Sequence, residues 1–494
     1  MMPRENQQSL DRRTLVREAR RTFFRDAFCG FGSLALASLA APASSRSSTC
    51  RSILGSASGA ESSTLAPRPA PRSATAKSVI FLFMAGGPSH LETFDPKPLL
   101  NKLDGQRRPA EFGEAKYQFV RTDARLLGSK RTFRRHGQSG LEVSDLFPHV
   151  ARHIDDIAVI RSCHGDKVVH SAAQYELFSG RTTPGFPSMG AWSIYGLGCE
   201  SDSLPSYVVM PDPDGALEAG QPMYMQGFLP ALFQPTMLRA GAKPVRNLDL
   251  PKHVSPSERA ATVNLIRQLN QAGLPAGDEE LAARLAAYEL AFKMQTEAPE
   301  AFDLNRETRA TLDLYGIGQT ATDDYGRRCL LARRLVERGV RFTVVVSGGG
   351  AATTQWDAHA DIEENHTRMA RETDQPIAGL LADLKQRGLL DSTLVLWGGE
   401  FGRSPEAESR RGRDHHNVGF TMWMAGGGIR GGQAVGATDA IGLRAVERPC
   451  HFRDLHTTML HLLGFEQNDL SYPHLGRNER LTLVEGEVIR EIVS

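Results

Sequence analysis

The chain has 494 residues, of which 40% are hydrophobic and 23% charged, and its formal net charge is +1. This length suffices for one large domain or two ordinary ones, and the composition is typical of a globular protein. The nearly neutral balance gives no reason to expect a nucleic acid or a membrane surface as a partner.

The chain begins with the pattern of an export signal. Arg20-Arg21-Thr22-Phe23-Phe24-Arg25 is a twin-arginine motif, an apolar stretch follows from Ala27 to Ala41, and Ala41-Pro42-Ala43 offers small residues for cleavage. The apolar stretch is too short, and too rich in small residues, for a stable membrane span. We therefore expect a signal peptide over residues 1–43, export by the twin-arginine route to a periplasmic or other extracytoplasmic space, and no transmembrane segment in the mature chain. A short amphipathic helix is the alternative.

Residues 44–76 are rich in Ser, Ala, Pro and Arg, which predicts a disordered linker before a folded domain over residues 77–494. The six cysteines are scattered and form no Cys-x-x-Cys pair, which argues against zinc-knuckle and thioredoxin-like sites.

Apolar runs and helical periodicity alternate along the predicted domain. Buried strands are predicted at 78–84, 157–160, 206–210, 340–346, 393–397 and 420–424. Helices are predicted at 171–178 with Ser171 as the cap, 279–295, 327–338, 375–387 and 454–463, whereas 212–274 is expected to be loop and cap material. The alternation predicts an α/β fold, a three-layer α/β/α sandwich with a mostly parallel central sheet.

Carboxylates and imidazoles gather after the later strands. Asp357 and His359 follow the strand at 340–346, Glu400 follows the strand at 393–397, and His415 and His416 are expected in a loop before the strand at 420–424. The carboxyl ends of parallel strands meet at one edge of a sheet, so we expect these side chains to converge.

Such a mixed set of oxygen and nitrogen donors suits a divalent metal ion, for which zinc, manganese and calcium are the candidates. A metal there would polarise an ester oxygen or activate a water. Each acid also has a structural alternative, since a carboxylate after a strand commonly binds loop amides. Glu400 could pair with Arg403, and Asp414 with Arg413 or Arg411.

Several motifs resemble known families. Val169-His-Ser-Ala-Ala-Gln-Tyr-Glu-Leu-Phe-Ser-Gly-Arg181 is similar to the sulfatase signature, and the first strand, the late His cluster and Leu462-Leu463-Gly464 fit the superfamily of alkaline phosphatases and sulfatases. More closely, the motifs HLETFDPKP, WDAH, GEFGRSP and GRDHH resemble an exported, uncharacterised bacterial family, domain of unknown function 1501, which is described as sulfatase-like. This resemblance runs from about Ser78 to the end and implies an alkaline-phosphatase-like fold.

The departures from that pattern matter for function. Sulfatases end the first strand with paired Asp ligands, where this chain has Gly86-Gly87, so His90 and Asp95 are candidate replacements. The nucleophile position falls on His170, followed by Ser171, outside the context that a formylglycine needs. The resemblance thus implies His170 and Ser171 as catalytic candidates, and His170 could attack or transfer protons. A loop hydrogen bond is the alternative role for His170.

The remaining assignments complete the hypothesis. The superfamily's other metal-ligand positions are matched by Asp357, His359 and His415 or His416. Glu400-Phe401 stands where the superfamily has an Asp-His pair. Candidate contacts for an anionic group of the substrate are Arg181 and His90. We expect an exported metal-dependent hydrolase of phosphate or sulfate esters, acting on an anionic ester or a sulfated glycan. A non-catalytic binding or assembly protein on the same fold is the main alternative, and a mutase or transferase is a third. The sequence leaves the oligomeric state open.

Overall fold

The computed structural model describes residues 65–115, 117–241, 244–245, 253–273, 279–296, 299–409 and 411–494. The expected signal peptide and the expected linker up to residue 64 lie outside these described residues. The described residues belong to one compact unit, Ser62–Ser494. Among them, none of the helices combines the length and apolar character that crossing a membrane would require.

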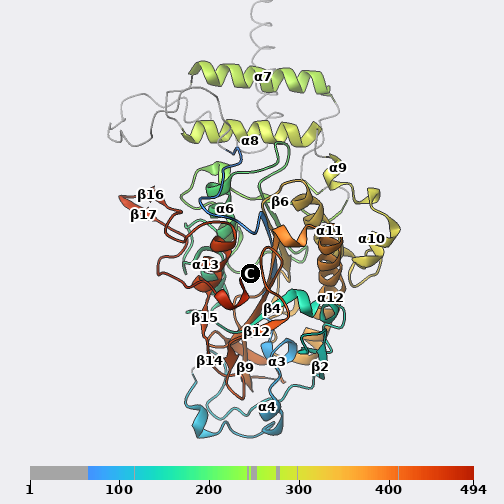
Figure 1. The fold of residues 1–494 in the computed structure, drawn as a ribbon, viewed down its shortest axis with the longest axis vertical. Helices are drawn as coiled ribbons and strands as arrows, with labels where there is room; N and C mark the ends of the chain where they lie inside the picture. The colour runs from blue at the N-terminus through green and yellow to red at the C-terminus, as the bar shows by residue number, and fades with distance from the viewer. Residues whose placement is uncertain are drawn as a thin grey trace, which may run out of the picture. The chain divides into compact units, whose positions relative to one another are not determined.

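A nine-stranded sheet runs through the described part of the chain (Figure 1). Its order is β12-β4-β11-β8-β1-β7-β5-β6, and β15 also pairs with β4. The central strand β1 is parallel to both neighbours, β7 and β8, whereas β11 is antiparallel to both of its neighbours. The predicted mostly parallel sheet is therefore confirmed. The strands are β1 (Ser78–Met84), β4 (Ile157–His164), β5 (Tyr207–Met210), β6 (Thr236–Met237), β7 (Phe342–Ser347), β8 (Thr393–Gly398), β11 (Phe420–Ala425), β12 (Gln433–Val435) and β15 (Cys450–His451).

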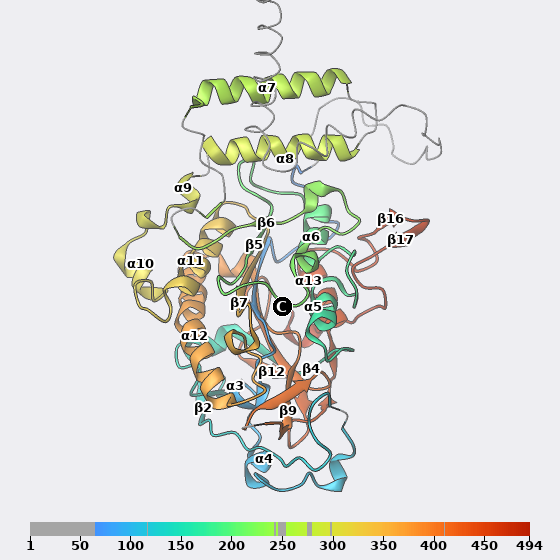
Figure 2. The ribbon, with the colours of Figure 1, turned by 180° about the vertical axis from the view of Figure 1, so that it is seen from behind.

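Strand β1 shows how the sheet divides the core in two. Its side chains alternate, so Val79, Phe81 and Phe83 enter one hydrophobic cluster while Ile80, Leu82 and Met84 enter the other. The first cluster includes residues of α5 (His170–Ser179), α6 (Met189–Leu197) and α13 (Phe452–Leu462), and the second includes residues of α11 (Asp323–Glu337) and α12 (Ile362–Gln386). The two views show these helix groups on opposite sides of the sheet (Figures 1 and 2). This is the expected three-layer arrangement.

Three predictions about helices were wrong. Helix α5 starts at His170, its cap residue is Val169, and no side chain caps it, so Ser171 lies inside the first turn. Helix α12 begins at Ile362, well before the predicted start at residue 375, and continues through Pro376. Burial of the apolar face of α12 outweighs the hydrogen bond that proline removes. Helix α7 (Pro256–Gly273) lies in the expected loop region, and its first residue is a proline, which suits a helix start.

An antiparallel pair outside the main sheet carries two of the predicted site residues. Strands β9 (Gly402–Ala407) and β10 (Arg413–His416) form a hairpin, so His415 and His416 belong to a strand and not to the expected loop. The hairpin follows the carboxyl end of β8, and α3 (His90–Thr93) follows that of β1. Both views place β9 and α3 beyond the same end of the sheet (Figures 1 and 2).

Candidate metal centre

Three imidazoles and one carboxylate meet at the carboxyl ends of β1, β7 and β8. His170 opens α5, Asp357 and His359 follow β7 after a short 3-10 turn at Ala352–Thr354, and His415 lies on β10. One ligand-type atom from each of these four residues lies within 4.8 Å of the others. The convergence expected from the strand order thus occurs for Asp357, His359 and His415, and it includes His170.

The spacing of these atoms is that of a coordination shell. Asp357 Oδ1 lies 3.0 Å from His359 Nε2 and 3.3 Å from His415 Nε2, and these two nitrogens are 2.9 Å apart. His170 Nε2 lies 3.4 Å from Asp357 Oδ2. Ligand atoms about 2.0–2.1 Å from a tetrahedral zinc ion would be about 3.3–3.4 Å from one another. The separations from Asp357 to His415 and to His170 match this spacing and the other two are shorter, so the group is compact enough to surround one ion.

Each imidazole is oriented from its other nitrogen. His170 Nδ1 lies 2.7 Å from Glu400 Oε1, His359 Nδ1 lies 2.6 Å from Glu408 Oε2, and His415 Nδ1 lies 2.8 Å from the carbonyl oxygen of Val168. With Nδ1–H donated outward, each Nε2 can present a lone pair to the centre. This outer arrangement of carboxylates and a carbonyl is typical of metal-ligating histidines.

His170 Nε2 supplies an independent test of the fit. It is buried, and its 3.4 Å contact with Asp357 Oδ2 lacks the geometry of a hydrogen bond, so this nitrogen has no hydrogen-bond partner among the described residues. Buried polar atoms are nearly always satisfied, so an unsatisfied nitrogen that faces a carboxylate and two imidazoles calls for a ligand. The donor set, three nitrogens and one oxygen, fits zinc best and calcium least.

Asp357 is held by a buried cation. Arg403 Nη2 donates to Asp357 Oδ1 at 2.5 Å, while Arg403 Nε donates to the carbonyl oxygen of Gly87 at 3.0 Å. Burial alone would raise the pKa of Asp357, but the Arg403 charge and the neighbouring imidazoles of His170, His359 and His415 outweigh it and hold the pKa far below its ordinary value. Asp357 is therefore a permanent carboxylate.

The three imidazoles differ in their affinity for a proton. Burial opposes charge on His170, but the adjacent carboxylates of Asp357 and Glu400 outweigh it and raise its pKa to about 9. The same competition raises the pKa of His359, whose partners are Asp357 and Glu408. His415 has a carbonyl as its outer partner, and burial together with the Arg403 charge lowers its pKa to about 4. Without a metal, the carboxylates therefore favour a proton on His170 and His359, whereas burial and Arg403 disfavour one on His415.

Glycines allow the loops to approach closely enough to build this centre. Gly86 has φ +104°, and a Cβ there would lie 2.5 Å from the backbone nitrogen of Asp357. The backbone nitrogen of Trp356 donates to the carbonyl oxygen of Ala85 at 2.9 Å, which joins the loop after β1 to the loop after β7. Gly86 and Gly87 thus permit a close approach of the chain to itself.

Two predicted ligands lie beside the centre without facing it. Glu400 accepts hydrogen bonds from Gly86 N at 3.1 Å and Gln174 Nε2 at 3.0 Å and contacts His170 through Nδ1, so it orients His170. Arg403 pairs with Asp357, and not with Glu400 as the structural alternative supposed. His416 Nε2 bonds to the carbonyl oxygen of Leu443 and lies outside the group of four.

Three further predicted residues are engaged elsewhere. Asp95 binds Lys97 at 2.9 Å and the Thr438 hydroxyl, and His90 Nε2 lies 2.9 Å from the carbonyl oxygen of Gly442. Arg181 pairs with Glu479 at 3.3 Å and lies over the ring of Phe186. Ser171 is half-buried in the first turn of α5, next to His170. The strand order thus brings Asp357, His359 and His415 together, whereas His90, Asp95 and Arg181 have ordinary structural partners.

Glu408, the outer partner of His359, was not predicted from the sequence. It lies in the polar turn of the β9–β10 hairpin and belongs to no motif, so only the pairing of the two strands reveals it. Asp414 was expected to pair with Arg413 or Arg411. It instead accepts hydrogen bonds from the backbone nitrogens of Phe119, Val120 and His415.

Comparisons with known proteins give a family and loose structural likenesses. A family model described as "Protein of unknown function (DUF1501)" matches residues 76–493, and no curated protein matches the chain. PsFucS1 sulfatase from Pseudoalteromonas sp. is 12% identical over 80% of this chain and 69% of its own, with a TM-score of 0.34. The phosphonate monoester hydrolase SpPMH from Silicibacter pomeroyi is 12% identical over 70% and 71%, with a TM-score of 0.33. Alkaline phosphatase from the Antarctic bacterium TAB5 is 12% identical over 72% and 92%, with a TM-score of 0.28.

Proposed function

Since this chain belongs to the DUF1501 family of proteins of unknown function, we propose a function from its own residues: it binds one divalent metal ion, zinc first among the candidates, and hydrolyses phosphate or sulfate esters. The observation that carries the proposal is the inward-facing set of His170, Asp357, His359 and His415. A site built only for stability would not need three imidazoles with their Nδ1 atoms bonded outward and their Nε2 atoms directed at one carboxylate.

The chain's own groups have defined tasks in this proposal. His170, His359, His415 and Asp357 would hold the ion, Arg403 fixes Asp357, and Glu400 and Glu408 fix two of the rings. A divalent ion in this position would polarise an ester oxygen and lower the pKa of a water. His170 is assigned here as a ligand, so Ser171, its neighbour in α5, becomes the candidate attacking hydroxyl.

Elemental analysis and ester turnover test the proposal together. We expect about one zinc or manganese ion per chain, and turnover of aryl phosphate or aryl sulfate that a chelator abolishes and added metal restores. Glu408→Gln should weaken metal affinity about 10–100-fold through His359. Glu364→Gln, at an exposed position on α12, is the matched control and should bind normally. A chain that takes up no metal, or a Glu408→Gln variant that binds like the control, would contradict the site.

One observation favours a second candidate, a non-catalytic binding or assembly protein. The carboxyl end of β1 contributes only the backbone of Gly86 and Gly87, where the resembled sulfatases have acids, so the centre has fewer ligands than theirs. Stoichiometric metal without turnover of any phosphate or sulfate ester, combined with retention on a sulfated glycan, would select this candidate.

We also propose export by the twin-arginine route, supported by Arg20-Arg21 and the apolar stretch behind them. Replacing both arginines with lysine should leave the full-length precursor in the cytoplasmic fraction, as measured by cell fractionation and intact mass. Normal export of that variant would refute the route without affecting the metal centre.

A further inference from the structure

An exposed aromatic ring lies over the candidate metal centre. Phe119 is 51% exposed, and its ring lies edge-on to His359 at 5.4 Å and to His415 at 6.1 Å between ring centroids. Phe401, which is fully buried, packs against His415 at 4.5 Å. His415 therefore contacts one aromatic ring that belongs to the core and another that faces solvent.

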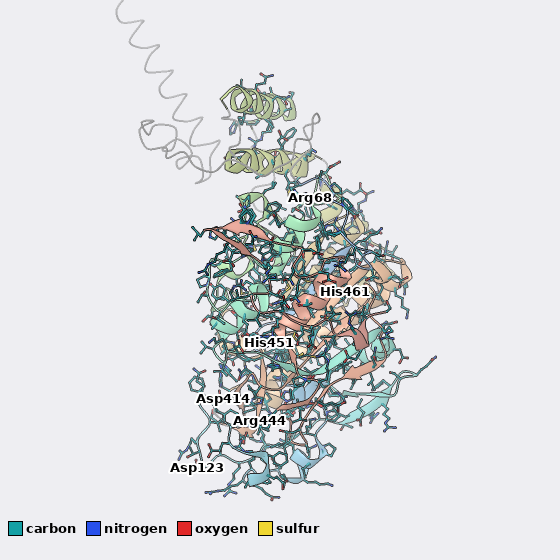
Figure 3. The ribbon with its side chains drawn as sticks, turned by 60° about the vertical axis from the view of Figure 1, so that its left-hand side comes forward. Arg68, Asp123, Asp414, Arg444, His451 and His461 are labelled. Atoms are coloured by element: carbon teal, nitrogen blue, oxygen red, sulfur yellow. The ribbon has the colours of Figure 1, made fainter. Side chains whose placement is uncertain are left out.

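The position of Phe119 is fixed by a buried carboxylate. Asp414 Oδ2 accepts hydrogen bonds from the backbone nitrogens of Phe119 at 2.6 Å and Val120 at 3.0 Å, and Asp414 Oδ1 accepts one from His415 at 2.7 Å. Asp414 is fully buried, and it lies at the same end of the molecule as Asp123, farther along the segment that carries Phe119 (Figure 3). One side chain thus ties the exposed ring to a residue of the centre.

A second exposed apolar residue adjoins the centre. Val169 caps α5, is 49% exposed, and directly precedes His170, while the carbonyl oxygen of Val168 holds His415. Single exposed apolar side chains are common and need no explanation. Here, however, Phe119 and Val169 both lie beside the four convergent polar residues, and buried Asp414 holds the backbone of Phe119 in place. This combination matches the composition of a small-molecule site, in which apolar walls surround a few polar groups.

We propose that Phe119 and Val169 form an apolar rim that binds the alcohol part of the substrate, and that the preferred substrates are esters whose alcohol carries a ring with an apolar face. The ester group would lie at the four polar ligands and the ring against Phe119, since an aromatic side chain offers a flat apolar face at small entropic cost. This inference rests on the proposed hydrolase function for its substrate class, and its test separates the two.

The test compares a ring-bearing and a ringless ester whose alcohols have similar acidity, benzyl phosphate and methyl phosphate, together with the corresponding sulfates. Phe119→Ala should lower the ratio of kcat/KM for benzyl over methyl ester about 3–10-fold, mainly through KM, because the contact forms before the reaction. Phe119→Trp should keep the ratio at or above that of the natural chain. Leu475→Ala, at an 89% exposed position in the β16–β17 hairpin (Tyr472–His474 and Arg477–Glu479), should leave the ratio unchanged.

Binding of benzylphosphonate and methylphosphonate to the metal-loaded protein, measured by calorimetry, repeats the comparison without turnover. If no ester is hydrolysed but Phe119→Ala still weakens benzylphosphonate selectively, the hydrolase proposal fails and the rim stands. If esters are hydrolysed but Phe119→Ala and Leu475→Ala have the same ratio as the natural chain, the rim is refuted and the hydrolase proposal stands. The melting temperature of Phe119→Ala shows whether this variant is folded. If it is not, the benzyl-over-methyl ratio of kcat/KM in Phe119→Trp tests the rim instead, and a ratio below that of the natural chain would refute it.

Discussion

At the scale of single residues, His170 makes the stability of the metal-free protein depend on pH. Its folded pKa of about 9 lies above its ordinary value of 6.5 because Asp357 and Glu400 favour its charged form. The stabilisation is therefore fully present below pH 6.5 and is lost as the pH rises through 9, with a total of about 3 kcal/mol.

Urea unfolding of chelator-treated protein between pH 6 and 9.5 measures this effect. We expect the difference in unfolding free energy between the natural chain and His170→Gln to be constant up to pH 6.5 and to shrink steadily toward pH 9. His136→Gln, on the hairpin strand β2 (Phe133–His136), is the control for a general loss of an imidazole. An unchanging difference over the whole range would show that folding does not shift the pKa of His170.

At the scale of secondary-structure elements, a fully buried ion pair fixes the β9–β10 hairpin against α3. Arg413 Nη2 donates to Glu92 Oε1 at 2.8 Å, and both side chains are completely buried. Glu92→Gln leaves the Arg413 charge without its counter-ion, so we expect a loss of about 3 kcal/mol of unfolding free energy. Asp313→Asn breaks the exposed i,i+4 pair with Arg309 and should cost less than about 0.5 kcal/mol. Equal costs in urea unfolding would mean that the buried pair adds nothing.

The same hairpin marks the limit of what the sequence predicts about this molecule. Strands such as Ser78–Met84 are continuous apolar runs, so the sheet and the residues at its edge could be anticipated. The hairpin strands are polar, Arg413-Asp-His-His416 among them, and their burial depends on partners distant in sequence, such as Glu92 and Asp357. Local pattern carries no sign of such partners, so Glu408, Phe119 and the true partner of Arg403 could not be found from it.

At the scale of the whole molecule, metal binding should stabilise the entire fold. The four ligand residues come from α5, from the loop after β7 and from β10, so the site exists only when these segments are assembled. A ligand that binds the folded state alone stabilises it by about 2.7 kcal/mol at a concentration 100 times its dissociation constant. We therefore expect zinc to raise the melting temperature and the urea midpoint of chelator-treated protein, with the increase growing logarithmically with free zinc.

Asp357→Asn should lose most of this response, because it removes the only carboxylate among the four ligands, whereas the exposed substitution Glu364→Gln should keep it. The two variants need not have the same stability without metal, since Asp357→Asn also deprives the buried Arg403 of its anionic partner, so the comparison concerns the shift that zinc causes in each. An equal shift in Asp357→Asn and the natural chain would place zinc elsewhere on the protein and would remove the physical basis of the proposed hydrolase.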